Sequence, residues 1–343
     1  MTAKKHRNIP IFIPHLGCPN LCVFCNQRSI SGCQSFERES VISEIEAALS
    51  TIPREYEVEI AYFGGSFTGI DRELMIYLLD VARSYVERED DGRARVIGIR
   101  MSTRPDYIND EIMDILSAYP IKTIELGLQS MSDEVLSLSK RGHTAKDAEN
   151  ACRLIRERGI DLVGQMMIGL PGGNLENELE TAKMICDMGA CGARIYPTVV
   201  FYDTELAEMA ERGEYQPIVL DDAVYRSKEV LKIFLERDVE CIRIGLCASD
   251  NLMDEKKVMG GANHSALGEL VIGEIYFDEM SELLSLYGSF AEGKIASFCV
   301  PQGEISKAIG QNRKNKQRLI EKYKLHGLTV KEHDAQTITL ALE

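Results

Sequence analysis

From its start to about residue 200, the sequence alternates between short β-branched runs and amphipathic helical stretches. The candidate strands are Ile11–Pro14, Val58–Phe63, Arg95–Arg100, Thr123–Leu128, Asp161–Ile168 and Ala193–Val199. Between these strands lie helical patterns at 39–50, 71–87, 109–118, 131–139, 146–158 and 176–188. This order predicts an α/β fold with a parallel sheet built from βαβ crossovers. Periodicity alone does not distinguish an open sheet from a partly closed barrel.

The alternation weakens after residue 200. Helical patterns at 203–212 and 221–237 lead to one more strand-like run at 240–246, and a glycine-containing stretch follows at 247–268. Segment 301–324 then carries seven Lys or Arg residues against two Glu, in a chain whose net charge is −15. This asymmetry predicts a separate module. We therefore expect a barrel with its extension at 1–246, a connecting segment at 247–295 and a small basic α/β module at 296–343.

Several classes of protein are excluded by composition. No stretch approaches the roughly 20 uncharged apolar residues that a membrane span needs, and the basic N-terminus lacks the apolar region of a secretory signal. Ten cysteines without such a signal indicate a reducing compartment, so we expect a cytoplasmic protein whose clustered thiols serve metal or redox chemistry. The negative net charge argues against a surface that grips nucleic acid everywhere, but it allows a local basic patch.

The strongest chemical signal is a C-x3-C-x2-C run, Cys18, Cys22 and Cys25, directly after the first predicted strand. Three thiolates on one loop can face a single metal centre, and a closed site would need four protein ligands. A 4Fe–4S cluster held by three cysteines leaves one iron open to a small chelating molecule. Two alternatives remain: a zinc site that also uses Cys33, and thiols buried without metal.

Six further stretches occur in a recognisable order: residues 62–68 (YFGGSFT), 102–106 (STRPD), 124–130 (IELGLQS), 140–144 (KRGHT), 167–172 (MIGLPG) and 194–198 (RIYPT). Together with the cysteine spacing, they resemble the radical SAM enzymes over roughly residues 8–215. The similarity is greatest to the radical SAM domain of the Elongator catalytic subunit, and weaker to oxygen-independent coproporphyrinogen oxidase. The resemblance implies a partial (β/α)6 TIM-like barrel. Elongator's acetyltransferase domain has no counterpart here, so acetyl transfer is not implied.

The resemblance also implies an activity and its cofactors. Such enzymes reductively cleave S-adenosyl-L-methionine (SAM) at a 4Fe–4S cluster and use the resulting 5′-deoxyadenosyl radical to abstract hydrogen. The similarity to Elongator implies tRNA or another RNA as the substrate, and an electron donor such as flavodoxin or ferredoxin. Two alternatives stay open: oxidation of a small metabolite such as a tetrapyrrole, and a non-catalytic, zinc-stapled RNA-binding protein.

The motifs carry over to a set of expected SAM contacts, which are Gly64, Gly65, Ser66, Ser102, Thr103, Arg104, Glu125, Gln129, Gly169 and Leu170. The two glycines after the second strand allow the backbone to approach a ligand. The guanidinium of Arg104 suits a carboxylate. For Glu125, a buried position with a structural arginine partner is an equally good interpretation.

The basic tail predicts a strand at 297–301, a helix at 304–310, a turn at 311–315, a helix at 316–324 and a strand at 328–331. With I-G-x-x-x-x-N at the turn, it resembles half of a KH RNA-binding domain, whose G-x-x-G loop clamps nucleotide backbone. Arg313 replaces the second glycine, which puts the clamp in doubt but adds a phosphate-seeking charge. A solvated basic lid is the alternative. The expected substrate or RNA contacts are Lys140, Arg141, His143, His264, Arg313, Lys314 and Lys316.

Overall fold

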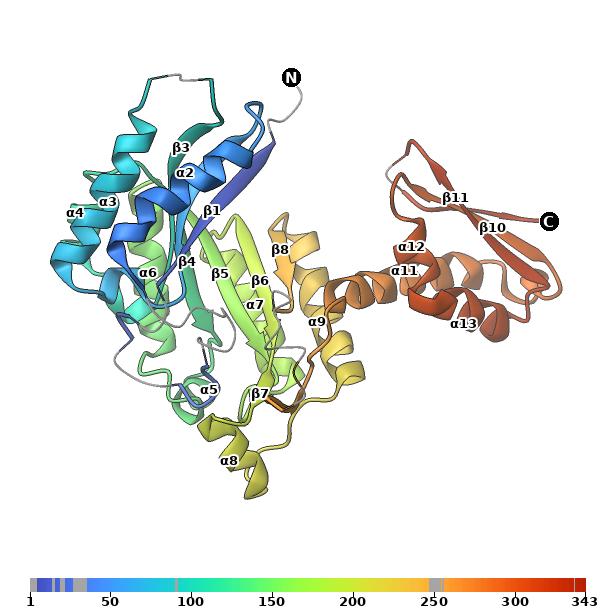
Figure 1. Cartoon of the computed structure of the whole chain (residues 1–343). Helices are drawn as coiled ribbons and strands as arrows, with labels where there is room; N and C mark the ends of the chain where they lie inside the picture. The colour runs from blue at the N-terminus through green and yellow to red at the C-terminus, as the bar shows by residue number, and fades with distance from the viewer. Residues whose placement is uncertain are drawn as a thin grey trace.

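A computed structural model describes residues 5–13, 16–18, 22–26, 36–89, 92–246, 254, 256–335 and 337–343. Its main feature is a parallel sheet in the order β1-β2-β3-β4-β5-β6-β8, curled into a half-barrel (Figure 1). The strands are β1 (His6–Phe12), β2 (Glu57–Phe63), β3 (Arg95–Thr103), β4 (Ile121–Gln129), β5 (Asp161–Ile168), β6 (Gly192–Pro197) and β8 (Glu240–Ile244). The expected partial barrel is confirmed.

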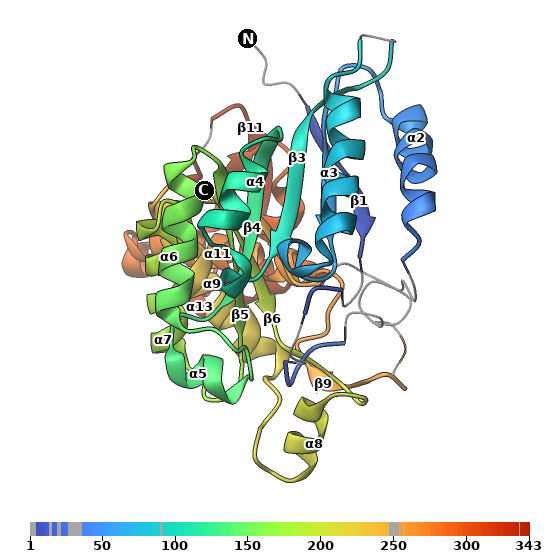
Figure 2. The ribbon, with the colours of Figure 1, turned by 90° about the vertical axis from the view of Figure 1, so that its left-hand side faces the viewer.

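Helices cover the outer face of this sheet (Figure 2). They are α2 (Val41–Thr51), α3 (Arg72–Val86), α4 (Asp110–Leu116), α5 (Asp133–Leu138), α6 (Ala145–Glu157), α7 (Leu175–Asp187) and α9 (Leu220–Glu236). Short 3-10 turns precede α2 (η1, Arg38–Ser40) and follow β2 (η2, Phe67–Gly69) and β3 (η3, Pro105–Tyr107). Alternate strand residues such as Ile60, Tyr62, Ile124 and Leu126 pack under these helices, so the other face of each strand is left for polar groups.

Two predicted strands differ from the structure. The first strand begins at His6 and ends at Phe12, so the predicted range Ile11–Pro14 was wrong. It lies at the edge of the sheet and exposes alternate residues, so its sequence lacks the continuous apolar run that marks a strand buried on both faces. Pro14 lies outside the described residues. The run Ala193–Val199 is divided between β6 and a three-residue strand, β7 (Val199–Phe201).

The stretch after β8 also contains structure that the sequence did not indicate. Strand β9 (Val258–Gly261) pairs antiparallel with β7. Gly261 has a φ of +92°, and a Cβ there would collide with the carbonyl oxygen of Thr198. Helix α8 (Glu205–Glu211) follows β7, so the two short strands and α8 form an extension at the carboxyl ends of the barrel strands (Figure 1).

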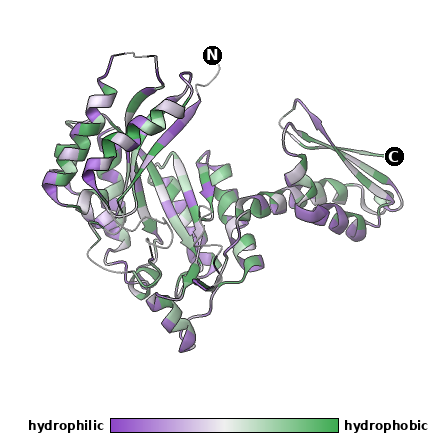
Figure 3. Ribbon diagram, viewed as in Figure 1, coloured by the Kyte–Doolittle hydropathy of each residue, from purple (hydrophilic) through white to green (hydrophobic). Residues whose placement is uncertain are grey.

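The tail folds as a small α/β module with its own sheet, β11-β10-β12. Its elements are β10 (Ile295–Pro301), α12 (Ile305–Ile309), η5 (Gln311–Arg313), α13 (Lys314–Tyr323), β11 (Gly327–His333) and β12 (Thr339–Leu342). The predicted order of strand, helix, turn, helix and strand is confirmed, with β10 and β11 parallel. The antiparallel strand β12 was missed. Helix α13 is largely hydrophilic (Figure 3).

One long helix, α11 (Leu267–Ser285), contributes to both cores. Leu267 and Val271 belong to the barrel core, whereas Met280 and Leu284 pack with Phe298 of β10 in the second core. A 3-10 turn, η4 (Gly288–Ala291), follows the helix. The segment at 247–295, expected to be a connection, therefore contains a helix on which the module is built. In the part of the chain that the structure describes, no helix could span a membrane.

Candidate active site

The cysteine loop lies at the carboxyl end of β1, seated between α5 and α8. The backbone N–H of Val23 donates to the carbonyl of Ser139 (3.3 Å), and its carbonyl accepts from Leu206 N–H (2.8 Å). The Val23 side chain is buried with Val200 and Leu206. Within the loop, Cys25 N–H donates to the carbonyl of Cys22 (2.9 Å). Cys22 is buried, and Cys18 and Cys25 are half-buried.

The glycines after β2 bring that strand's end against the cysteine loop. A Cβ at Gly65 would collide with the Leu16 carbonyl, and a Cβ at Gly17, whose φ is +74°, would collide with the Ser66 carbonyl. Ser66 N–H donates to Leu16 O (3.2 Å). The close backbone approach expected at Gly64 and Gly65 is thus made to the loop that carries the cysteines. A contact of these two glycines with SAM stays a prediction.

Buried hydroxyl groups join the ends of β2 and β3. Ser66 Oγ and Thr68 Oγ1 lie 2.8 and 2.6 Å from Thr103 Oγ1. Ser66 Oγ also accepts from the backbone N–H of Arg104 (3.3 Å). The Arg104 guanidinium, expected to hold a carboxylate, holds Asp106 with two hydrogen bonds of 2.9 and 2.8 Å. Ser102 is half-buried and stands beside Glu125 in the register of β3 and β4.

The inner face of the barrel carries a buried network of charges. Glu125 is fully buried and accepts hydrogen bonds from Arg100 (2.8 Å), Arg194 (2.8 and 3.0 Å) and Gln165 (2.8 Å). Burial alone would raise the pKa of Glu125, but Arg194 and Arg100 outweigh it and hold that pKa below its usual value. Arg100 also donates to Glu59 (2.7 Å). Of the two roles considered for Glu125, this geometry is that of a carboxylate with structural arginine partners.

The loop after β5 is held from outside by residues that sequence reasoning missed. Glu178 Oε1 of α7 accepts from Gly169 N–H (2.8 Å), and Tyr215 Oη donates to Gly169 O (2.7 Å). Burial raises the pKa of Glu178 to about 7. A carboxylate on the apolar stripe of α7, together with Ala182 and Ile185, was the available signal. Gly169 (φ +78°) and the buried Leu170, both expected SAM contacts, form the loop that these residues fix.

The run 140–144 does not form one surface. Lys140 points outward and pairs with Glu205 of α8 (2.6 Å). Arg141 is buried and donates to Cys22 Sγ (3.2 Å) and to Gly127 O (2.7 Å). His143 is also buried, and among the described residues neither of its ring nitrogens has a hydrogen-bond partner. Burial, with a contribution from Arg141, lowers the pKa of His143 to about 4.

A cavity of about 450 Å³ opens beside this run, between α5 and α6. Lys140 and His143 line it, so two of the expected substrate contacts share one cavity near the cysteine loop. Gln129, an expected SAM contact, has a φ of +67° and a buried Oε1 for which the described residues supply no hydrogen-bond partner. His264 is elsewhere, at the start of α11, where its Nδ1 accepts from Ala266 N–H (3.1 Å).

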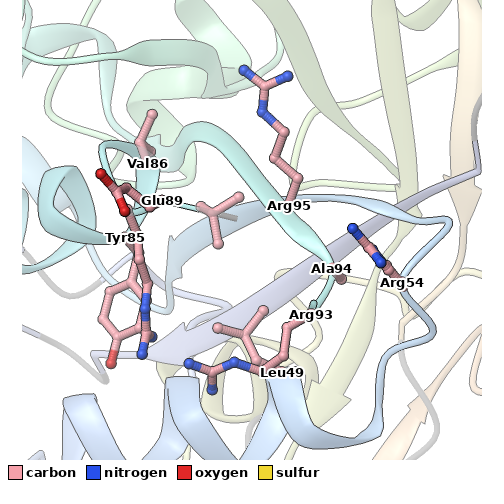
Figure 4. Close-up of a pocket in the computed structure, with 10 residues that line it drawn as sticks. Leu49, Arg54, Tyr85, Val86, Glu89, Arg93, Ala94 and Arg95 are labelled. Atoms are coloured by element: carbon pink, nitrogen blue, oxygen red, sulfur yellow. The ribbon is translucent and has the colours of Figure 1, made fainter. Parts of the chain in front are cut away.

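A second cavity, of about 470 Å³, lies at the opposite ends of the strands (Figure 4). It is lined by the ends of α2 and α3 and the start of β3, including Leu49, Tyr85 and Arg95. Arg88 and Arg93 on its wall pair with Glu46. Because it is far from the cysteine loop in a parallel sheet, this cavity is not part of the candidate site.

The surroundings of the three thiols fit the iron–sulfur cluster that the sequence implies. Sulfur donors in this number suit a 4Fe–4S cluster with one open iron, and the buried guanidinium of Arg141 faces Cys22. Burial raises the pKa of Cys18, so metal binding would have to drive its deprotonation. Among the described residues, no three metal-ligating side chains are gathered closely enough to hold a metal ion as they stand. Cys33 lies outside the described residues.

Comparison with known proteins connects this geometry to a family. The model of the radical SAM superfamily matches residues 12–185, and the model of the radical SAM C-terminal domain matches residues 191–276. An uncharacterized protein of Methanocaldococcus jannaschii is 30% identical over 298 residues, which cover 83% of this chain and 86% of that protein.

Two further similarities are to a curated archaeal enzyme and to a solved archaeal structure. The tRNA uridine(34) acetyltransferase of M. jannaschii is 27% identical over 230 residues, which are 63% of this chain but only 41% of that enzyme. The solved structure of Elp3 from Methanocaldococcus infernus, with an N-terminal deletion, has a TM-score of 0.61 at 21% identity and covers 81% of this chain and 68% of that one. This likeness shows the fold. The family match favours the iron–sulfur interpretation of the cysteine triplet over the zinc alternative. The chain is a member of the radical SAM superfamily, and its cofactors are those of this family of enzymes, a 4Fe–4S cluster and SAM.

Proposed function

We propose that this radical SAM enzyme modifies RNA, and that its substrate is a base of tRNA. The observation that carries the proposal is the turn between α12 and α13 in the basic module. Residues 311–314 of this turn are all exposed. Asn312 and Arg313 have positive φ values of 53° and 63°, so the backbone turns through left-handed conformations between α12 and α13. The similarity to a tRNA acetyltransferase supports the same substrate class.

The cations at this turn are available for phosphate. Arg313, Lys314 and Lys316 form no ion pair within the part of the chain that the structure describes. By contrast, Arg318 pairs with Glu274, and Lys322 donates to Ser281 (2.7 Å). Lysine and arginine contacts to phosphate supply most of the sequence-independent affinity for nucleic acid.

Asn315, the last residue of the I-G-x-x-x-x-N pattern, explains how the turn is fixed. It is buried, and its Nδ2 donates to Gly273 O of α11 (2.6 Å) and to Ala308 O of α12 (3.4 Å). Gly310, whose φ is +76°, packs against the same side chain. The turn is therefore a preformed surface, so binding an RNA backbone does not require it to be ordered first.

The position of the module favours a large substrate over a metabolite. Helix α11 has 19 residues, about 28 Å of helix at 1.5 Å per residue. Its first half packs on the barrel and its second half in the module core, which lies away from the carboxyl ends of the barrel strands (Figure 1). A small molecule held in the barrel would not reach the basic turn, whereas an RNA can contact both.

The barrel and the basic module would have different tasks. When bound, the cluster and SAM supply the radical chemistry that removes a hydrogen atom from the substrate, with electrons from a donor such as flavodoxin or ferredoxin. Cys18, Cys22 and Cys25 would hold the cluster, and Glu178 and Tyr215 hold the loop expected to contact SAM. The module binds the RNA backbone. We expect the protein in the cytoplasm, the compartment that the cysteines indicate, where it would encounter tRNA.

Retardation of tRNA by the full-length protein in native gels tests the proposal. Arg313→Glu with Lys316→Glu should weaken binding by about 10- to 100-fold and flatten its salt dependence, because two phosphate contacts become repulsive. The control is Arg153→Glu with Lys183→Glu, which makes the same charge change on exposed faces of α6 and α7. If the two double variants retard tRNA equally and without dependence on salt, the RNA substrate is rejected in favour of a small molecule. The same conclusion follows if the unmodified protein does not retard tRNA.

A further inference from the structure

Arg141 is a buried cation that forms no ion pair with a carboxylate of any described residue. Its side chain is 6% exposed, and its two terminal nitrogens donate to Cys22 Sγ (3.2 Å) and to Gly127 O at the end of β4 (2.7 Å). Its Nε is buried and has no hydrogen-bond partner in the part of the chain that the structure describes. The carbonyl of Arg141 accepts from Arg104, so this residue joins the ends of β3 and β4 to the cysteine loop.

Other buried arginines of the barrel interior differ in this respect. Arg104 is paired with Asp106, and Arg100 and Arg194 are paired with Glu125. Within the residues that the structure describes, Arg141 forms no such ion pair. Burying a charge is costly unless an opposite charge or a metal centre compensates for it. The position therefore calls for an anion, and the closest acidic atom is the sulfur of Cys22.

We propose that Arg141 is a positioning residue for the iron–sulfur cluster, and that the compensating anion is the thiolate-ligated cluster itself. The guanidinium holds the Cys22 sulfur and would fix the position of this thiolate as a ligand of the cluster. Lys140, with a φ of +51°, turns the chain directly before Arg141. This turn separates the inward side chain of Arg141 from the solvent-facing Lys140, so the two neighbouring cations of the run 140–144 have different tasks.

The charge on the cluster gives Arg141 a second effect. Reduction by a one-electron donor adds one electron and no proton, so the cluster becomes more negative. A cation that donates a hydrogen bond to a ligand sulfur stabilises the reduced form more than the oxidised form, which raises the reduction potential. Arg104 is farther from Cys22, with its Nη1 4.0 Å from the sulfur, and its charge is already balanced by Asp106. Arg141 therefore carries most of the effect.

The potential of the cluster, measured without any RNA, tests this proposal. Full-length protein and its variants are reconstituted anaerobically and poised with dithionite and mediators, and the reduced cluster is quantified by electron paramagnetic resonance. At the midpoint of the unmodified protein, Arg141→Met should lower the ratio of reduced to oxidised cluster about tenfold, as expected for loss of a charge-assisted hydrogen bond. Arg141→Lys, which keeps the charge, should lie in between.

Arg153→Met is the matched control, because Arg153 is exposed on α6 and pairs with Glu157 (2.7 Å). It removes the same charge from the chain and should leave the ratio unchanged. If Arg141→Met retains too little iron to measure, Arg141→Gln replaces it, with a decrease of several-fold expected. A ratio in Arg141→Met equal to that of the unmodified protein would overturn the proposal. If that equal ratio came with weakened SAM binding, the anion facing Arg141 would be the SAM carboxylate.

Discussion

The barrel interior and the basic turn of the module use the same kinds of charged side chain in opposite ways. In the barrel, Arg100 and Arg194, whose side chains are only 12% and 11% exposed, both pair with the fully buried Glu125. At the turn, Arg313 and Lys314 are exposed and form no ion pair with any described residue. A desolvated arginine needs a fixed partner and so supports the fold, whereas a solvated one keeps its charge for a ligand. Burial, more than residue type, separates structure from recognition here.

Removing Glu125 should have the largest effect on stability. Glu125→Ala leaves the largely buried guanidinium of Arg194 without its carboxylate and Arg100 with Glu59 alone, so we expect a loss of about 3–5 kcal/mol in the free energy of unfolding. Urea unfolding of the full-length protein measures it. The control is Glu321→Ala, an exposed position on α13, which should change stability by less than about 0.5 kcal/mol. Similar losses for both variants would break the distinction between the two regions.

His143 should give the barrel a pH dependence that the module lacks. Its folded pKa of about 4 lies below the usual value of about 6.5. The stability that it contributes is therefore complete above about pH 6.5 and is lost as the pH falls toward 4. Between pH 7 and 4.5, the unmodified protein should lose about 2 kcal/mol that His143→Leu does not lose. His326→Leu, at an exposed position of the module, should retain the full pH dependence; a matching change there would contradict this assignment.

Asn315 tests whether the turn depends on its buried anchor. Asn315→Ala leaves the Gly273 and Ala308 carbonyls without their donor, which should cost about 1–2 kcal/mol in unfolding free energy. Because the turn loosens, retardation of tRNA should weaken as well, although every cation is retained. Gln317→Ala, on the exposed side of α13, is the control for both measurements. Unchanged RNA binding by Asn315→Ala would show that a preformed turn is not needed.

Glu46 should give the smallest effect, although it belongs to the barrel. Hydrogen bonds from Arg93 and Tyr85 lower its pKa to about 2. The stability that it contributes is thus present above about pH 4.5 and is lost as the pH falls toward 2. Since Glu46 and Arg88 are both well exposed, Glu46→Gln should cost only about 0.5 kcal/mol at pH 7 and less in high salt. A loss as large as that of Glu125→Ala would show that burial does not set the size of these effects.

The order of strands and helices could be predicted because it depends on local periodicity. The helical pattern at 146–158 corresponds to α6 at 145–157, and the candidate strand Asp161–Ile168 matches β5. The pairing of β7 with β9 could not be predicted, since the two strands are short and α8, α9 and β8 lie between them in the sequence. The double role of α11 was hidden for a related reason: nearly all of its faces are apolar enough to pack, so its sequence does not indicate two cores.

The candidate site, too, could be predicted only in part from the sequence. The cysteine spacing and the motif order identified the family, which the comparisons confirm. The partners of each side chain depend on which strands are neighbours and in what register, and a single sequence does not contain this information. Glu125 therefore had two equal interpretations, and Arg141 was grouped with Lys140 as a substrate contact. The structure places these two adjacent residues on opposite sides of the loop, one at Cys22 and the other at Glu205.

The central claim is that Cys18, Cys22 and Cys25 hold a 4Fe–4S cluster at which SAM is cleaved, and formation of 5′-deoxyadenosine tests it most directly. Anaerobically reconstituted protein, reduced with dithionite and incubated with SAM and total RNA, should form this product, and the triple replacement of the three cysteines by alanine should abolish it. The replacement of Cys152, which is buried in the barrel core, by alanine should leave product formation intact in the folded protein. Product formation that survives the triple replacement would contradict the claim, as would reconstituted protein that binds only zinc.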